Sequence, residues 1–209
     1  KEKYIEILCN EMIPAVSEER LAVYCDVFCE KGYFEIDETK KILETAISYG
    51  LKPRLHADEF VDSNAAELAA EIDAISADHL MAINDDGIKA LANKNVIATI
   101  LPGTTFFLGK NTYANGRKLL DSGCKVAIAS DFNPGSCTIQ SMSMIMALSS
   151  IYCGLSIKES FLGSTYNGAL SLGKENSIGL IKEGYFADII FWDIENFNEI
   201  PYWIGNERI

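Results

Sequence analysis

The chain repeats one order of elements, an apolar strand followed by an amphipathic helix, about five times with short connections. The strand-like segments are residues 21–28, 52–56, a run ending at 79, 96–102 and 124–131; the helical patterns lie at 38–49, 65–72, 84–94, 113–122, 139–152 and 156–172. Strand–helix–strand units place parallel strands beside one another with the helices as crossovers. The pattern therefore predicts an α/β fold built on a parallel sheet.

The number of strands limits how such a sheet closes. A closed barrel needs eight strands, whereas an open doubly wound sheet does not, and this chain supplies only about five. The chain also opens on Lys1 rather than Met and goes straight into a helical pattern, which we expect to stop at Pro14. We therefore expect a fragment, the later half of a (β/α)8 TIM-type barrel over residues 1–176.

Residues 177–209 no longer show the strand–helix alternation of the segment before them. They contain glycines at 179 and 184 and the strand-like run ADIIFWD at 187–193, without a helical crossover. Short strands of this kind need partner strands from elsewhere. We expect them to be C-terminal strands of a small β-sandwich domain.

Residues suited to catalysis follow the ends of three predicted strands. His56 and Glu59 lie in LHADEF, His79 ends the run ISADH, and Asp131 opens the loop DFNPGS. The carboxyl ends of parallel strands are the edge where active sites form. An imidazole is a natural zinc or iron ligand, and a glutamate close by can accept a proton from activated water. A carboxylate that closes an apolar strand is costly unless it is paired or bound to metal.

Two further features extend this candidate site. His79 is suited to polarising a carbonyl group. The loop after Asp131 offers the amide of Asn133, the backbone near Gly135 and the hydroxyl of Ser136 to a small polar ligand.

Each of these residues also has a purely structural interpretation. The two histidines can be hydrogen-bonded core residues, and Glu59 can be an acid that stabilises a helix N-terminus. Asp131 can cap a helix or form an Asx turn, and any tight turn would resemble the loop that follows it. Asp58, inside LHADEF, is expected to point outward or to cap a helix.

Composition excludes several classes of partner. The chain has 30 acidic and 18 basic residues, a net charge of −12, which disfavours binding to nucleic acids and anionic membranes. No apolar run approaches the roughly 18–20 residues that a membrane helix needs. The six cysteines lie inside apolar runs, as expected for reduced thiols in a cytoplasmic protein. Nucleotide-binding glycine motifs, GxSxG and HExxH do not occur.

The order and spacing of several stretches resemble a known family. HADEF, ELAAEIDAISADHL, ILPGTTFFL, ASDFNPGS and the closing GLIKEGYFADIIFWD are similar to the C-terminal half of the imidazolonepropionases, which are metal-dependent amidohydrolases. The resemblance covers essentially the whole chain. It implies hydrolysis of the cyclic amide of 4-imidazolone-5-propanoate to N-formimidoyl-L-glutamate in histidine degradation, with one divalent metal, zinc or iron.

The resemblance also implies roles for individual residues. His56 and Asp131 match metal ligands, Glu59 the base that activates water, and His79 the histidine that polarises the carbonyl. Three residues match the loop that contacts substrate and product: Asn133, Gly135 and Ser136. The family further implies a homodimer of the intact protein.

One departure from the family pattern affects what this chain can do. The HxH pair that supplies further metal ligands is missing, because His56 and His79 are the only histidines. Catalytic zinc usually has three protein ligands, so we expect the isolated chain to bind metal poorly and to be inactive. A ring deaminase of the same superfamily and a non-catalytic half-barrel module are the alternatives.

Overall fold

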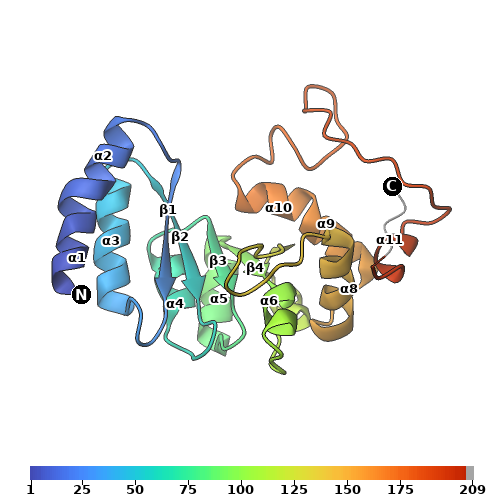
Figure 1. The fold of residues 1–209 in the computed structure, drawn as a ribbon, viewed down its shortest axis with the longest axis horizontal. Helices are drawn as coiled ribbons and strands as arrows, with labels where there is room; N and C mark the ends of the chain where they lie inside the picture. The colour runs from blue at the N-terminus through green and yellow to red at the C-terminus, as the bar shows by residue number, and fades with distance from the viewer. Residues whose placement is uncertain (206–209) are drawn as a thin grey trace. The chain divides into compact units, whose positions relative to one another are not determined.

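The structure is a computed structural model that describes residues 1–205. The chain divides into two compact units, Lys1–Val96 and Ile97–Ile209 (Figure 1). This division differs from the boundary expected after residue 176, which stays a prediction.

The first unit is built on three parallel strands. They are β1 (Tyr24–Cys29), β2 (Lys52–Ala57) and β3 (Ser76–His79), and their register places Val27 beside Leu55 and Leu55 beside Ala77. These residues are buried, and helices α3 (Ile36–Ser48) and α4 (Ala65–Glu71) pack against the strands. Helix α5 (Asp85–Lys94) packs on α4.

The other side-chain row of these strands is polar. Because side chains alternate along a strand, Asp26, Arg54, His56 and Asp78 share the face opposite to the helices. The register pairs Asp26 with Arg54 and His56 with Asp78. Imidazole and charged groups are therefore gathered on one side of an otherwise apolar sheet.

The N-terminal helix does not stop at Pro14, so that prediction was wrong. Helix α1 (Glu2–Ile7) continues through a π-helical turn (Leu8–Met12) into α2 (Ile13–Glu18). The N–H of Ile13 bonds to the carbonyl of Leu8, five residues earlier. Pro14 then falls in the first turn of α2, where a missing N–H costs little.

The second unit contains the parallel strands β4 (Ile97–Ile100) and β5 (Val126–Ile128). Its helices are α6 (Pro102–Phe107), α7 (Gly116–Asp121), α8 (Met142–Tyr152), α9 (Ile157–Ser164), α10 (Tyr166–Ser171) and α11 (Glu199–Tyr202). Helices α9 and α10 pack on β5. They replace the single helix expected over 156–172, which breaks at Thr165 (φ −115°, ψ −93°).

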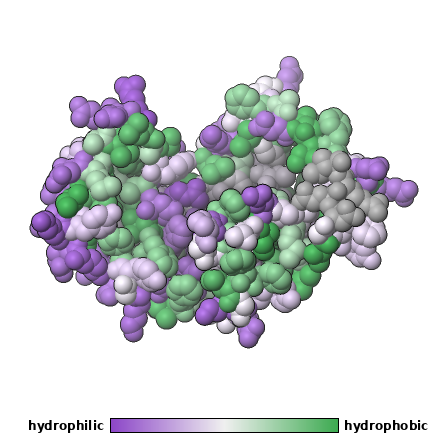
Figure 2. Space-filling model, in the orientation of Figure 1, coloured by the Kyte–Doolittle hydropathy of each residue, from purple (hydrophilic) through white to green (hydrophobic). Residues whose placement is uncertain are grey.

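The segment expected to form β-sandwich strands has none among residues 177–205, and residues 206–209 lie outside the described part. Several of its apolar side chains are exposed, among them Ile181 at 88% and Phe191 at 84%. Hydrophobic residues are visible at the surface of the molecule (Figure 2). A strand needs a neighbouring backbone to bond its N–H and C=O groups. The β-sandwich assignment stays a prediction.

All six cysteines are free thiols, and every one except Cys25 is buried. Burial raises the pKa of Cys153 to about 12 and that of Cys29 to about 11. These thiols are therefore poor nucleophiles at neutral pH. Among the described residues, no helix is long and apolar enough to cross a membrane.

Candidate active site

The predicted site residues fall into two groups, one in each unit. The first unit holds His56 near the end of β2, Glu59 in the loop after β2, and His79 at the end of β3. The second unit holds Asp131 and the loop that follows it. Each group is described within its own unit.

His56 lies near the carboxyl end of β2, on the polar face of the sheet. The side chain is half-buried, and its Nδ1 lies 3.0 Å from Oδ1 of Asp26. A carboxylate at one ring nitrogen fixes the orientation and tautomer of a histidine, which is how many metal-binding histidines are held. The geometry favours Nε2 as the ligand atom.

Glu59 and His79 are both buried and face one another. Oε2 of Glu59 lies 3.6 Å from Nε2 of His79, whose side chain is only 2% exposed. The ring centroids of His56 and His79 are 5.2 Å apart. The structure thus brings together the three site residues that were predicted in this unit.

Backbone strain is concentrated at the same place. Asp58, His79 and Leu80 have positive φ angles of 49°, 82° and 64°. Such conformations cost a non-glycine residue of order 1 kcal/mol or more, and they cluster at functional sites. Hydrogen bonds hold the strained backbone, because Leu80 N–H bonds to Ala57 O at 3.0 Å and Ala82 N–H bonds to Asp58 O at 2.8 Å.

A charged cluster adjoins His56. Asp26, His56 and Asp78 each place one ligand atom within 4.8 Å of the others. Burial raises the pKa of Asp78, and the guanidinium of Arg54, 3.2 Å away, opposes that shift. Because Arg54 already supplies a positive charge, we assign no metal ion to this cluster.

Asp131 lies three residues after the end of β5 at Ile128 and has a left-handed backbone, φ 54°. Its Oδ2 accepts hydrogen bonds from the hydroxyls of Thr104, in α6, and Ser136, at 3.2 Å. Thr104 is fully buried. Both bonds fall on one oxygen, which leaves Oδ1 as the atom that suits a cation.

Asn133 organises the loop after Asp131. Its Oδ1 accepts the N–H groups of Gly135 and Ser136, both at 2.8 Å, and its Nδ2 donates to Asp131 O at 2.8 Å and Ser136 Oγ at 2.7 Å. This is an Asx-type turn, but Asn133 forms it, whereas the alternative considered above was an Asx turn of Asp131. The side chains of Asn133 and Ser136 are therefore occupied within the loop itself.

Comparison with known proteins decides the family. Residues 30–208 match the model of the amidohydrolase family. The chain belongs to the amidohydrolase family. This amidohydrolase chain is 47% identical over 206 residues to an imidazolonepropionase of Phocaeicola vulgatus, covering 99% of the chain and 50% of that relative. An imidazolonepropionase of Alkaliphilus oremlandii is 44% identical over 208 residues, covering 100% of the chain and 49% of the relative. The chain thus spans about half the length of the curated relatives it matches.

Solved structures confirm the amidohydrolase fold. Aspergillus niger ochratoxinase superposes with a TM-score of 0.73 at 17% identity, over 94% of this chain and 50% of that one. A Xanthomonas campestris adenosine deaminase with bound zinc gives a TM-score of 0.69 at 16% identity, over 85% and 46% of the two chains. The parallel α/β arrangement is therefore part of a TIM-type barrel, as predicted.

Several polar residues that contact the candidate site residues were not predicted from the sequence. Asp26 and Arg54 could have been recognised in the sequence, because each is a charged residue inside a predicted strand and alternates with apolar neighbours. Thr104 could not, because its role depends on a contact with Asp131, a residue 27 positions away. Asp58 is fully buried and caps α4, so its expected outward orientation was wrong and the capping alternative is confirmed.

Proposed function

We propose that this chain supplies half of an imidazolonepropionase, which hydrolyses the cyclic amide of 4-imidazolone-5-propanoate to N-formimidoyl-L-glutamate in histidine degradation. The observation that carries this proposal is the buried pair of Glu59 and His79, with Oε2 and Nε2 3.6 Å apart, beside His56. The 44–47% identity to imidazolonepropionases over nearly the whole chain supports the choice of substrate.

One divalent metal, zinc or iron, would be held by His56 and Asp131 together with ligands from outside this chain. Imidazole nitrogen and carboxylate oxygen are donors that both metals accept. Within each unit the donor is already oriented, His56 by Asp26 and Asp131 by Thr104. The metal, when bound, supplies Lewis-acid activation of water.

Glu59 would serve as the general base of the reaction. As water adds to the ring carbonyl carbon, Glu59 accepts the proton of that water, and it then returns the proton to the ring nitrogen as the C–N bond breaks. A buried carboxylate suits this task because its surroundings hold it in one place, within reach of the water and the ring nitrogen.

His79 would stabilise the negative charge that develops on the carbonyl oxygen. A ring N–H aimed at that oxygen acts most strongly in a buried site, and His79 is almost completely enclosed. Its contact with Glu59 keeps the base and the charge-stabilising group beside one reacting carbon.

The loop of Asn133, Gly135 and Ser136 would bind substrate and product mainly through its backbone. The side chains of Asn133 and Ser136 bond within the loop, so they shape it for the ligand. In this proposal the side chains of Asn133 and Ser136 do not contact the substrate directly.

The isolated chain would bind metal poorly and be inactive, since it has no further histidine to complete the ligand set. The intact protein would be a cytoplasmic homodimer that acts on a small molecule, with no nucleic-acid or membrane partner. The net charge of −12 supports the last point.

The test is ring opening of 4-imidazolone-5-propanoate, generated in place, by the full-length protein, with metal content determined on the same sample. We expect activity that disappears on chelation and returns with zinc or iron. A fully metallated protein that deaminates purine or pyrimidine rings instead would replace this proposal with the deaminase alternative, which the fold shared with the zinc-bound adenosine deaminase supports. A metal-free, inactive protein would favour a non-catalytic module.

A further inference from the structure

Glu30 is a buried carboxylate to which the reaction described above gives no part. It follows the last residue of β1 and is only 2% exposed. Burying a carboxylate costs several kcal/mol unless hydrogen bonds replace its lost water. The partners that replace that water therefore indicate what Glu30 does.

Both carboxylate oxygens accept backbone N–H groups. Oε1 accepts the N–H of Lys31 at 2.9 Å, and Oε2 accepts the N–H of Phe60 at 2.8 Å. The backbone of Glu30 is itself fixed, because its N–H bonds to Phe34 O at 3.0 Å and its carbonyl accepts from Tyr33 at 2.9 Å. A rigid turn after β1 thus bonds to the residue that follows Glu59.

The residue that precedes Glu59 is anchored separately. The carboxylate of Asp58 accepts the N–H of Ser63 at 2.9 Å and that of Ala66 at 3.0 Å, while its carbonyl accepts from Ala82 at 2.8 Å. Glu59 therefore lies between two backbone positions that are each hydrogen-bonded to a different part of the unit.

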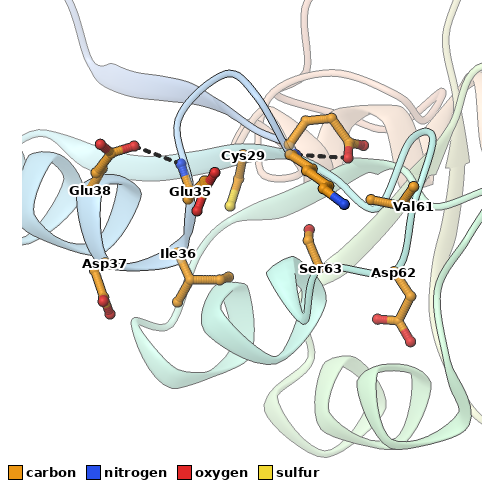
Figure 3. A pocket seen from close by; sticks show the side chains of 10 residues that line it. Cys29, Glu35, Ile36, Asp37, Glu38, Val61, Asp62 and Ser63 are labelled. Carbon is orange, nitrogen blue, oxygen red and sulfur yellow. Dashed lines mark hydrogen bonds between the residues drawn. The ribbon is translucent and has the colours of Figure 1, made fainter. Parts of the chain in front are cut away.

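Hydrophobic burial does not hold this loop in place. The side chains of Phe60 and Val61 are 49% and 41% exposed. Val61, Asp62 and Ser63 line a hollow beside the turn after β1 (Figure 3). The hollow has a volume of about 520 Å³ and is also lined by Glu30 and Lys31. An edge contact between the rings of Phe60 and Phe28, whose centroids are 6.4 Å apart, also reaches β1. The bond from Phe60 N–H to Glu30 is the contact that fixes the loop backbone on this side.

We propose that Glu30 is a positioning residue that fixes the backbone at Phe60 and thereby aims the carboxylate of Glu59 at the reacting water. This inference rests on the proposed function for the chemical role of Glu59. A displacement of a general base by about 1 Å costs on the order of 100-fold in rate, so a single backbone anchor suffices to matter.

The test compares Glu30→Gln with Asp37→Asn in the full-length, metal-loaded protein. Glutamine keeps the shape of Glu30, but its NH2 group must face one of the two N–H donors. Asp37 lines the same hollow and is exposed, so its variant controls for the loss of a nearby charge. The first readout is amide hydrogen exchange of the peptide that contains Phe60.

We expect exchange in that peptide to be at least tenfold faster in Glu30→Gln and unchanged in Asp37→Asn. On 4-imidazolone-5-propanoate, kcat should fall about 10- to 100-fold in Glu30→Gln, with KM within about twofold and metal content unchanged. Glu30→Asp, which retains the charge, should recover part of kcat.

Unchanged exchange in Glu30→Gln would overturn the anchor, and faster exchange with unchanged kcat would overturn its catalytic consequence. If Glu30→Gln does not fold, the Glu30→Asp variant decides by the same two readouts. Should the metal-loaded wild-type protein fail to open the ring, the proposed function falls, while the exchange comparison still decides whether Glu30 anchors the loop.

Discussion

The two loops that carry the catalytic acids are held by different means. Residues 57–64, the glutamate loop, depend on contacts with distant segments, since Glu30 and Ala82 bond to its backbone. Residues 130–137, the aspartate loop, are organised mainly from within by Asn133. The hydroxyl of Thr104, a distant residue, reaches the carboxylate of Asp131 directly.

The difference matches the work proposed for each acid. A general base must stay aimed while it gains and loses a proton, so its backbone is fixed on both sides. A metal ligand needs one oxygen turned toward the ion, and hydrogen bonds to its other oxygen achieve that. Removing an anchor should therefore disturb the fold in the glutamate loop and the metal affinity in the aspartate loop.

The largest effect on stability is expected for Asp58→Ala. The change leaves the buried N–H groups of Ala65 and Ala66 and that of Ser63 without their acceptor. We expect the free energy of unfolding to fall by about 3 kcal/mol or more, measured by denaturant titration. A loss below about 1 kcal/mol would show that the glutamate loop does not depend on this carboxylate.

Thr104→Val should weaken metal binding rather than the fold. It removes a hydrogen bond to Oδ2 of Asp131 without changing the size of the side chain. In the full-length protein we expect zinc to bind about tenfold more weakly to this variant than to wild type, measured by chelator competition.

Thr105→Val is the matched control for Thr104→Val. Thr105 is equally buried, and its hydroxyl has no hydrogen-bond partner among the described residues. Equal zinc affinities in the two variants would contradict the role given to Thr104.

Asn133→Ala should cost less than Asp58→Ala. The N–H groups of Gly135 and Ser136 lose an acceptor, but Gly135 is exposed and water can replace the bond. We expect a loss of about 1 kcal/mol in the free energy of unfolding, by the same titration. A loss as large as that of Asp58→Ala would remove the distinction between the loops.

An exposed ion pair outside both loops gives the smallest expected effect. The guanidinium of Arg117, whose nitrogens lie 3.1 and 3.0 Å from Glu159, lowers the pKa of Glu159 to about 2. The pKa of this carboxyl is lower in the folded state, so the pair stabilises the protein above about pH 4.5 and loses this effect as the pH falls toward 2.

The Glu159→Gln variant tests this pair. Solvent screening limits the difference from wild type to about 1 kcal/mol at pH 7. The free energy of unfolding of wild type and variant, measured at pH 7 and near pH 2, should differ at pH 7 and be equal near pH 2. A difference that grows as the pH falls would contradict the assignment.

The sequence predicted local features well. Strand–helix alternation located the five strands found in residues 1–205. Strand β1 begins at Tyr24 rather than at residue 21, and Leu21 and Val23 are exposed. The spacing of Ser156 and Glu159, three positions apart at a helix start, predicts a capping box, and the structure contains it. These features depend on neighbours in the chain, which a sequence displays directly.

Features that depend on distant contacts were not predictable. The bond from Phe60 to Glu30 joins residues 30 positions apart, and the bond from Thr104 to Asp131 joins residues 27 apart. The N-terminal helix continues past Pro14 because of a π-helical turn, and no residue type in the sequence indicates such a turn. The site residues were found because they lie at or after strand ends. Glu30 also follows a strand, β1, but its supporting role is visible only in its contacts.

The most direct test of the central claim compares Glu59→Gln with Asp131→Ala in the full-length protein. Metal content and ring opening of 4-imidazolone-5-propanoate are measured on the same preparations. We predict that Glu59→Gln keeps its metal and loses about 100-fold or more in kcat, whereas Asp131→Ala loses its metal. A Glu59→Gln variant that opens the ring at the wild-type rate would contradict the assignment of this buried glutamate as the base.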